Sequence, residues 1–166
     1  MNQIKAGILL CSMLLAATSA LASPFYIGAQ ADNTAGGILL GYQLDKTFTL
    51  EARYRKSEEL ISHSGVTSDT SISAAGLSVL AMFPLKMTGG SSYLVFAKAG
   101  YERRNIDETY TFPTSVTYNG TVNNVENRTI IGTGVQYEFY QHVSGRAGFE
   151  SMGDQRSIYL AVLFTF

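Results

Sequence analysis

The last ten residues of the chain constrain its fold most strongly, because large apolar side chains occupy every second position there. Smaller or more mixed residues fill the positions between them. The large apolar set is Ile158, Leu160, Val162, Phe164 and Phe166. An alternation of period two indicates a β-strand with one face in an apolar environment. We therefore predict a terminal strand at residues 157–166 whose partners lie earlier in the chain.

Seven earlier segments show a similar alternation and are separated by turn-forming or polar residues. With the terminal strand, they predict strands at residues 25–32, 35–44, 48–55, 70–83, 92–105, 128–140, 143–151 and 157–166. Two stretches between them, residues 56–69 and 106–127, are polar and aperiodic, and we expect long loops there. Eight strands of roughly 8–14 residues are near the length of about 9–11 that a tilted transmembrane strand requires.

The amino-terminal stretch has the features of a secretory signal peptide. Lys5 precedes an apolar run, and Ala20-Leu21-Ala22 has the small residues of a cleavage site. We expect cleavage of residues 1–22, which leaves residues 23–166 as one domain. Cys11, the only cysteine, lies in the cleaved part, so the mature chain has no thiol nucleophile and no cysteine-ligated metal.

The charge and the histidine content exclude several classes of function. The chain has 12 Lys and Arg against 13 Asp and Glu, so it lacks the basic footprint of a nucleic-acid-binding protein. Only two histidines are present. We therefore expect no nucleic-acid partner, no metal site and no cofactor.

Alternation alone fits both a membrane barrel and a soluble carrier barrel, which turns its apolar face inward. Two features favour the membrane. Many glycines, such as Gly41, Gly76 and Gly132, lie on the polar faces, where small residues make room in a narrow interior. Aromatic residues such as Tyr54 and Tyr101 lie near the ends of the apolar faces, as at membrane interfaces.

Several motifs resemble the small outer-membrane barrels of the OmpA transmembrane-domain, OmpX and opacity-protein type. They are KAGYE at residues 98–102, GTGVQY at 132–137, RAGF at 146–149 and LFTF at 163–166. The resemblance implies an eight-stranded antiparallel up-and-down barrel in the outer membrane of a Gram-negative bacterium. It implies outer-membrane lipid and lipopolysaccharide as surroundings, and Phe164 and Phe166 as part of the signal that the insertion machinery reads.

Charged residues share the predicted interior face. The set is Glu51, Arg53, Arg55, Lys98, Glu102, Arg104, Glu138, Arg146 and Glu150. Both signs are present, as a buried charge set requires. We expect a structural network that fills the interior. The alternative is a gate, in which Glu51, Lys98, Glu138 and Arg146 exchange partners, as charged residues do on corresponding strands of the OmpA-type barrel that the chain resembles.

His142-Val143-Ser144 imitates the H-x-S pattern of outer-membrane lipid A deacylases. His142 falls at the inner turn, whereas lipid A lies in the outer leaflet, and Glu150 is about 20 Å along the strand from Ser144. We therefore expect no enzyme. The prediction is a non-enzymatic surface protein that contributes to envelope integrity or surface contact through its two long loops. A small low-conductance pore is the alternative, and a lipid A-modifying enzyme ranks third.

Overall fold

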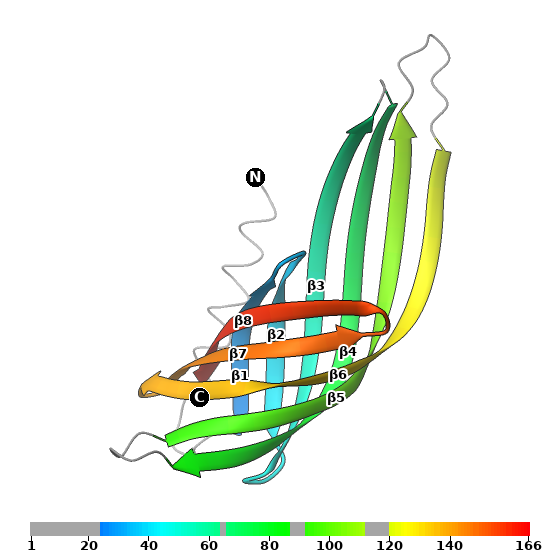
Figure 1. The fold of residues 1–166 in the computed structure, drawn as a ribbon. Helices are drawn as coiled ribbons and strands as arrows, with labels where there is room; N and C mark the ends of the chain where they lie inside the picture. Colours follow the sequence, from blue (N-terminus) through cyan, green and yellow to red (C-terminus); the bar gives the residue numbers. More distant parts are fainter. Residues whose placement is uncertain (1–23, 64–65, 87–91, 112–119) are drawn as a thin grey trace.

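The computed structural model describes residues 24–63, 66–86, 92–111 and 120–166. Eight strands in these residues form one closed antiparallel barrel in chain order (Figure 1). They are β1 (Phe25–Asp32), β2 (Gly36–Gln43), β3 (Phe48–His63), β4 (Val66–Lys86), β5 (Ser92–Thr111), β6 (Gly120–Tyr140), β7 (Val143–Met152) and β8 (Gln155–Thr165). The predicted eight-stranded antiparallel up-and-down barrel is confirmed.

The predicted signal peptide, residues 1–22, lies outside the described residues. The described part of the chain contains no helix that is long and apolar enough to cross a membrane.

The terminal strand closes the barrel, as its alternation predicted. β8 pairs with β7 on one side and with β1 on the other. Beyond the last residue of β8, the amide of Phe166 donates a hydrogen bond to the carbonyl of Phe25 at 3.2 Å. The first and last strands therefore meet edge to edge, and both chain ends of the barrel lie at the same end, which we call the terminal end.

The barrel is apolar outside and polar inside. Leu160 and Val162 on β8 are exposed, whereas Tyr159, Ala161 and Leu163 between them are buried. The other large apolar residues that face outward include Ile38, Leu40, Phe48, Tyr54, Leu77, Val79, Tyr101, Ile131, Val135 and Phe139. A soluble barrel would have the reverse arrangement, because exposed apolar surface of this extent is unfavourable in water.

The predicted long loops at residues 56–69 and 106–127 are largely strand instead. β3 continues to His63 and β4 begins at Val66, while β5 continues to Thr111 and β6 begins at Gly120. Their pairing is unbroken, from Ser57 opposite Ile72 to His63 opposite Val66 in the first hairpin. Figure 1 shows β3 to β6 rising far beyond the short strands β1, β2, β7 and β8. We call this the extension, and its end of the barrel the extended end.

The strands of the extension were not predicted because their side chains do not alternate between apolar and polar. Beyond the barrel, neither face of a strand has to match hydrocarbon, so polar residues occupy both faces. The backbone can still pair with its neighbours, and Ser, Thr and Val suit extended structure. Hydrophobic periodicity appears only where one face of a strand meets an apolar environment and the other a polar one. Strand pairing does not need this difference, so it continues beyond the barrel.

Connections at the terminal end are short. Between β2 and β3, the Asp45 carboxylate accepts hydrogen bonds from the amides of Phe48 and Thr47, each at 2.7 Å, and these bonds lower the pKa of Asp45. Between β6 and β7, His142 adopts a positive φ of 68° beside a register shift at Glu138 and Tyr140. β4 runs to Lys86, three residues beyond the predicted strand end at residue 83.

Candidate functional site

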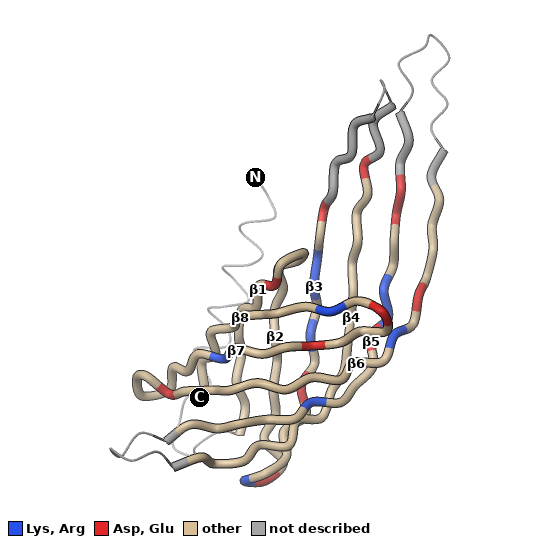
Figure 2. The backbone as a smooth tube through the Cα atoms, viewed as in Figure 1, with Lys and Arg blue, Asp and Glu red and all other residues tan. Residues whose placement is uncertain are grey.

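The barrel interior is the most distinctive polar region of the molecule. Long charged side chains enter it from the odd-numbered strands β1, β3, β5 and β7. β3 provides the largest share, since Glu51, Arg53 and Arg55 point inward while Ala52 and Tyr54 between them point outward. Figure 2 shows acidic and basic residues following one another along these strands.

In the half of the interior toward the extended end, two arginines alternate with two acids. Arg55 lies between Asp32 and Glu102, with Nη1 2.5 Å from the Asp32 Oδ2 and Nη2 3.0 Å from the Glu102 Oε1. Arg53 approaches the other oxygen of Glu102, with Nη2 2.7 Å from Oε2. The Sδ atom of Met152 lies 3.1 Å from the Arg53 Nη2 and 3.2 Å from the Arg55 Nη2.

The other half continues the same alternation toward the terminal end. Arg53 also pairs with Glu150. The Nζ atom of Lys98 lies 2.8 Å from both the Glu150 Oε1 and the Glu51 Oε1. Arg146 pairs with the remaining Glu51 oxygen. The result is one chain of alternating charges across the barrel.

The four carboxylates and four cations of this chain balance. In order, they are Asp32, Arg55, Glu102, Arg53, Glu150, Lys98, Glu51 and Arg146. We call them the charge ladder. Each of its three glutamates uses both oxygens, one for each of two cations. Removing ions from water costs several kcal/mol per ion, and only such complete pairing offsets that cost.

Polar and aromatic neighbours complete the terminal-end side of the ladder. The Tyr26 hydroxyl donates to the Glu51 Oε2 at 2.6 Å. The Arg146 guanidinium donates to the Gln136 Oε1 at 2.9 and 3.1 Å. Its carbon also lies 5.4 Å from the centre of the Tyr26 ring and 5.2 Å from that of Phe96. Arg146 is therefore held by charge, hydrogen bonds and ring faces together.

Glycines on the even-numbered strands make the space that the ladder occupies. Gly41 is directly opposite Glu51 in the β2–β3 pair, and Gly76 is opposite both Arg53 and Glu102. Gly132 lies opposite Lys98 and Glu150. A Cβ atom at Gly132 would lie 3.0 Å from the Glu150 Cγ. At Gly41 a Cβ atom would overlap the Tyr26 ring, and at Gly132 it would also lie 2.8 Å from the Phe149 carbonyl oxygen. Neighbouring side chains and backbone therefore leave little room for a larger residue at these two positions.

Buried apolar side chains, which we call the apolar layer, pack beside the ladder in the interior. Its members are Leu39, Leu80, Met82, Phe96, Tyr159, Ala161 and Leu163, with Tyr26 and Leu94 packed against them. Leu39 is directly opposite Arg53, and the Lys98 Nζ lies 5.6 Å from the centre of the Tyr159 ring. Leu80, Phe96 and Leu163 are each no more than 1% exposed.

The structure brings together seven of the nine predicted interior charges. They are Glu51, Arg53, Arg55, Lys98, Glu102, Arg146 and Glu150, all buried in the ladder. Arg104 is half-buried and lies outside the ladder. Glu138 is different: it is exposed at the end of β6, beside the register shift, and Gln136 takes the position opposite Arg146. Its parity is inward as predicted, opposite the buried Ser144, but the position lies at the strand end, where the side chain is exposed. The prediction that Glu138 joins the charge network is therefore wrong for the ladder that the structure describes, because parity fixes the face of a residue and not its height in the barrel.

The predicted set of interior charges omitted one charged member of the ladder, Asp32, and two of its neutral partners, Tyr26 and Gln136. Each lies on the same strand face as a predicted residue or an interior glycine. Asp32, for example, follows Tyr26, Gly28 and Gln30 at intervals of two. Strand parity therefore indicates the inner face for all three.

The H-x-S pattern does not form a nucleophilic triad in this structure. Ser144 is buried, and its Oγ accepts a hydrogen bond from the Gln136 Nε2 at 3.2 Å. Glu150 is held by Lys98 and Arg53. His142 lies in the β6–β7 turn with its ring centre 6.3 Å from that of Phe164. The described residues contain no group of three or more His, Cys, Asp and Glu side chains that could hold a metal ion.

The two aromatic residues of the predicted assembly signal lie at the terminal end. Phe164 faces outward and is 41% exposed. Its ring packs edge-on against Phe166, with the ring centres 5.3 Å apart. Their part in insertion stays a prediction.

Two solved structures share this fold. The N-terminal β-barrel domain of Pseudomonas aeruginosa OprF has a TM-score of 0.60 at 19% identity, with 86% of this chain and 96% of that chain covered. Neisserial surface protein A (NspA) has a TM-score of 0.58 at 16% identity, with 89% and 100% covered. No protein family and no curated protein sequence matches the chain. At these identities, the likeness is one of fold.

Proposed function

We propose that the chain is a non-enzymatic protein of the Gram-negative outer membrane that spans the bilayer as a sealed barrel and presents its extension outside the cell. There it contributes to envelope integrity or to contact with other molecules. The observation that carries the proposal is the inversion of polarity: an apolar outer wall surrounds an interior of paired charges.

The outer wall supports the membrane setting. On β5, outward positions from Tyr93 to Tyr101 are apolar, and the next outward residue is Arg103. Nine residues match the roughly 9–11 that a tilted strand needs to cross the hydrocarbon core. Aromatic residues lie at both limits of the apolar band, with Tyr54 and Tyr101 toward the extended end and Phe48 and Phe139 toward the terminal end. Such girdles are typical of membrane barrels.

The placement of the connections supports the orientation. Membrane barrels of this kind have short turns on the periplasmic side and longer outer segments. The chain ends and the tight turns share one end here, and the extension lies at the other. We therefore place the terminal end in the periplasm and the extension outside the cell.

The packed interior favours a surface or structural role over the small pore. Lys98, Arg146 and Glu51 are each no more than 2% exposed, and the apolar layer packs beside them. A conducting path would require several ion pairs to separate and the apolar layer to move. The extension, in contrast, offers polar surface, such as the exposed Lys56–Glu58 pair with its charged atoms 2.6 Å apart.

Planar-bilayer recordings test the sealed barrel. The full chain would be inserted into bilayers, and insertion would be verified by heat-modifiable migration on gels and by recovery in outer-membrane fractions of expressing cells. We expect no discrete openings from inserted protein. Stable openings of the unmodified barrel would contradict this proposal and support the small low-conductance pore. Lipid A mass spectra that differ between cells with and without the gene would replace it by an enzyme.

A further inference from the structure

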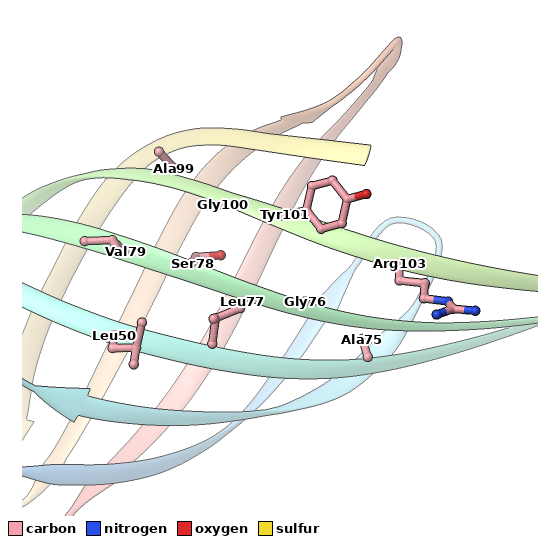
Figure 3. Close-up of a pocket in the computed structure, with 10 residues that line it drawn as sticks. All are labelled: Leu50, Ala75, Gly76, Leu77, Ser78, Val79, Ala99, Gly100, Tyr101 and Arg103. Carbon is pink, nitrogen blue, oxygen red and sulfur yellow. The ribbon is translucent and has the colours of Figure 1, made fainter. Parts of the chain in front are cut away.

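A shallow groove runs along the outer wall across β3, β4 and β5 (Figure 3). Its apolar sides include Leu50, Leu77, Val79 and Tyr101, which come from all three strands. The floor is low because glycine and alanine lie between these larger side chains, among them Ala75 and Ala99. A groove with apolar walls on the outside of a membrane barrel suits an acyl chain.

One end of the groove is charged. Arg103 lines it, and Figure 3 shows its guanidinium beside Ala75 at the limit of the apolar residues. Arg103 is exposed and follows Tyr101 by two residues on the outward face of β5. Because Tyr101 lies at the edge of the apolar band, Arg103 lies at the height of lipid headgroups.

Arg103 has no acid to pair with in the part of the chain that the structure describes. Its paired neighbours are Ala75 on β4 and Asn127 on β6, neither of which is acidic. The cations of the ladder are all paired, and Lys56 on β3 is paired with Glu58. An exposed guanidinium at the polar end of an apolar groove can receive an anionic headgroup, and its planar fork suits phosphate.

We propose that this groove binds a phosphorylated lipid of the outer leaflet, with an acyl chain along Leu77, Val79 and Ala99 and a headgroup phosphate on Arg103. The inference rests on the proposed function, since it needs the extended end to face the outer leaflet. It assigns the lipid to one sector of the wall, whereas a lipid that only solvates the barrel would show no preference among sectors.

Matched variants of the full chain test the site. Arg103→Gln removes the charge, and its control is Arg156→Gln, an exposed arginine next to the apolar band on β8. Ala99→Leu fills the groove, and its control is Ala29→Leu on the outward face of β1. Each protein would be placed in phosphatidylcholine nanodiscs and titrated with bisphosphorylated lipid A, with phosphate-free lipid A and with inorganic phosphate. Native mass spectrometry would count the bound lipid.

We expect Arg103→Gln to weaken binding of bisphosphorylated lipid A about tenfold, which corresponds to about 1.4 kcal/mol, without changing the phosphate-free form. Ala99→Leu should weaken both forms, and the two controls neither. Equal binding by Arg103→Gln and Arg156→Gln would overturn the site. Displacement of lipid A by millimolar inorganic phosphate would make it a free-anion site and overturn the lipid as occupant. A barrel absent from outer-membrane fractions would instead refute the proposed function.

Discussion

Each glutamate of the charge ladder pairs with two cations, and Arg55, Arg53 and Lys98 each pair with two acids. Arg146, at the end of the ladder, pairs with Glu51 alone. Glu51 illustrates this, because one oxygen faces Lys98 and the other faces Arg146 and the Tyr26 hydroxyl. Loss of a single cation would leave a carboxylate oxygen without its counter-charge in a space lined by packed side chains. The ladder is thus strongly sensitive to changes of single residues.

Arg146→Ala should lower the free energy of unfolding by about 3–5 kcal/mol, since it removes one partner of a buried pair. The barrel should still close, because its strand pairing does not involve this side chain. Urea titration of the barrel in lipid vesicles, followed by heat-modifiable migration, measures the change. Arg156→Ala, on the outside of β8, is the control, and we expect it to stay within about 0.5 kcal/mol of wild type. Equal midpoints for the two variants would contradict a buried ladder.

Gly41→Ala should destabilise the barrel, because a Cβ atom there would overlap the Tyr26 ring. Moving that ring breaks its hydrogen bond with Glu51, and we expect a loss of about 1–3 kcal/mol, as for other overpacked sites. Gly76→Ala is the comparison, since its nearest atoms would be 3.2 and 3.3 Å away. We expect it to remain within about 1 kcal/mol of wild type. The same urea titration measures both, and the reverse order would contradict the interior packing.

The inward residues of the site could be predicted from sequence, but their pairing could not. Strand parity alone places Glu51, Lys98 and Arg146 on the inner face. That Arg146 meets Glu51, 95 residues away, depends on the stagger of all the strands around the barrel. Parity likewise places Glu138 on the inner face, opposite Ser144, but it does not show that the position lies at the strand end, outside the ladder. Periodicity thus reports the face of a residue, and barrel geometry decides its partner.

At the scale of elements, the strands of the barrel and those of the extension differ in their sequence patterns. Within the membrane band, apolar and polar residues alternate, so the sequence located all eight strands. In the extension, the strands are held by backbone pairing among β3, β4, β5 and β6, with side-chain contacts such as the Asn123–Asp107 hydrogen bond of 2.9 Å. The sequence of the extension is polar and lacks alternation, and this pattern predicts a loop.

Shortening the first hairpin of the extension should leave the barrel intact. Glu59 and Thr70 are directly paired, so an Asn-Gly turn can replace residues 60–69. Because the removed residues lie beyond the closed barrel, we expect an unchanged urea midpoint and normal heat-modifiable migration. A variant that fails to reach the outer membrane folded would show that the extension is needed for assembly.

The outward face of β6 separates the membrane band from the extension. Val135 is exposed and pairs with Val95 and Ala147 on the outer wall. Val135→Arg should lower stability in vesicles by about 2–4 kcal/mol, the cost of a cation near mid-membrane. Val125→Arg is the matched control, the same substitution on the same face of the same strand, at an exposed position in the extension opposite Asn105, and we expect no measurable change. Urea titration measures both variants. An unchanged urea midpoint for Val135→Arg would contradict the placement of the membrane band.

At the scale of the whole molecule, the barrel reverses the usual distribution of polarity. Its charges are buried and paired, and most of its largest apolar side chains face outward. The soluble alternative, a carrier barrel with an apolar interior, would place Leu160 inside and Arg146 outside. The central claim is therefore about which face meets lipid.

The most direct test is the accessibility of single cysteines along β8 in lipid vesicles. In a chain with Cys11→Ser, spin labels at positions 158 to 163 would be exposed in turn to oxygen, which concentrates in lipid, and to a water-soluble nickel complex. We expect oxygen to reach labels at Ile158, Leu160 and Val162, and neither reagent to reach those at Tyr159, Ala161 and Leu163. Collision of the nickel complex with the labels at Ile158, Leu160 and Val162 would contradict a membrane-spanning barrel.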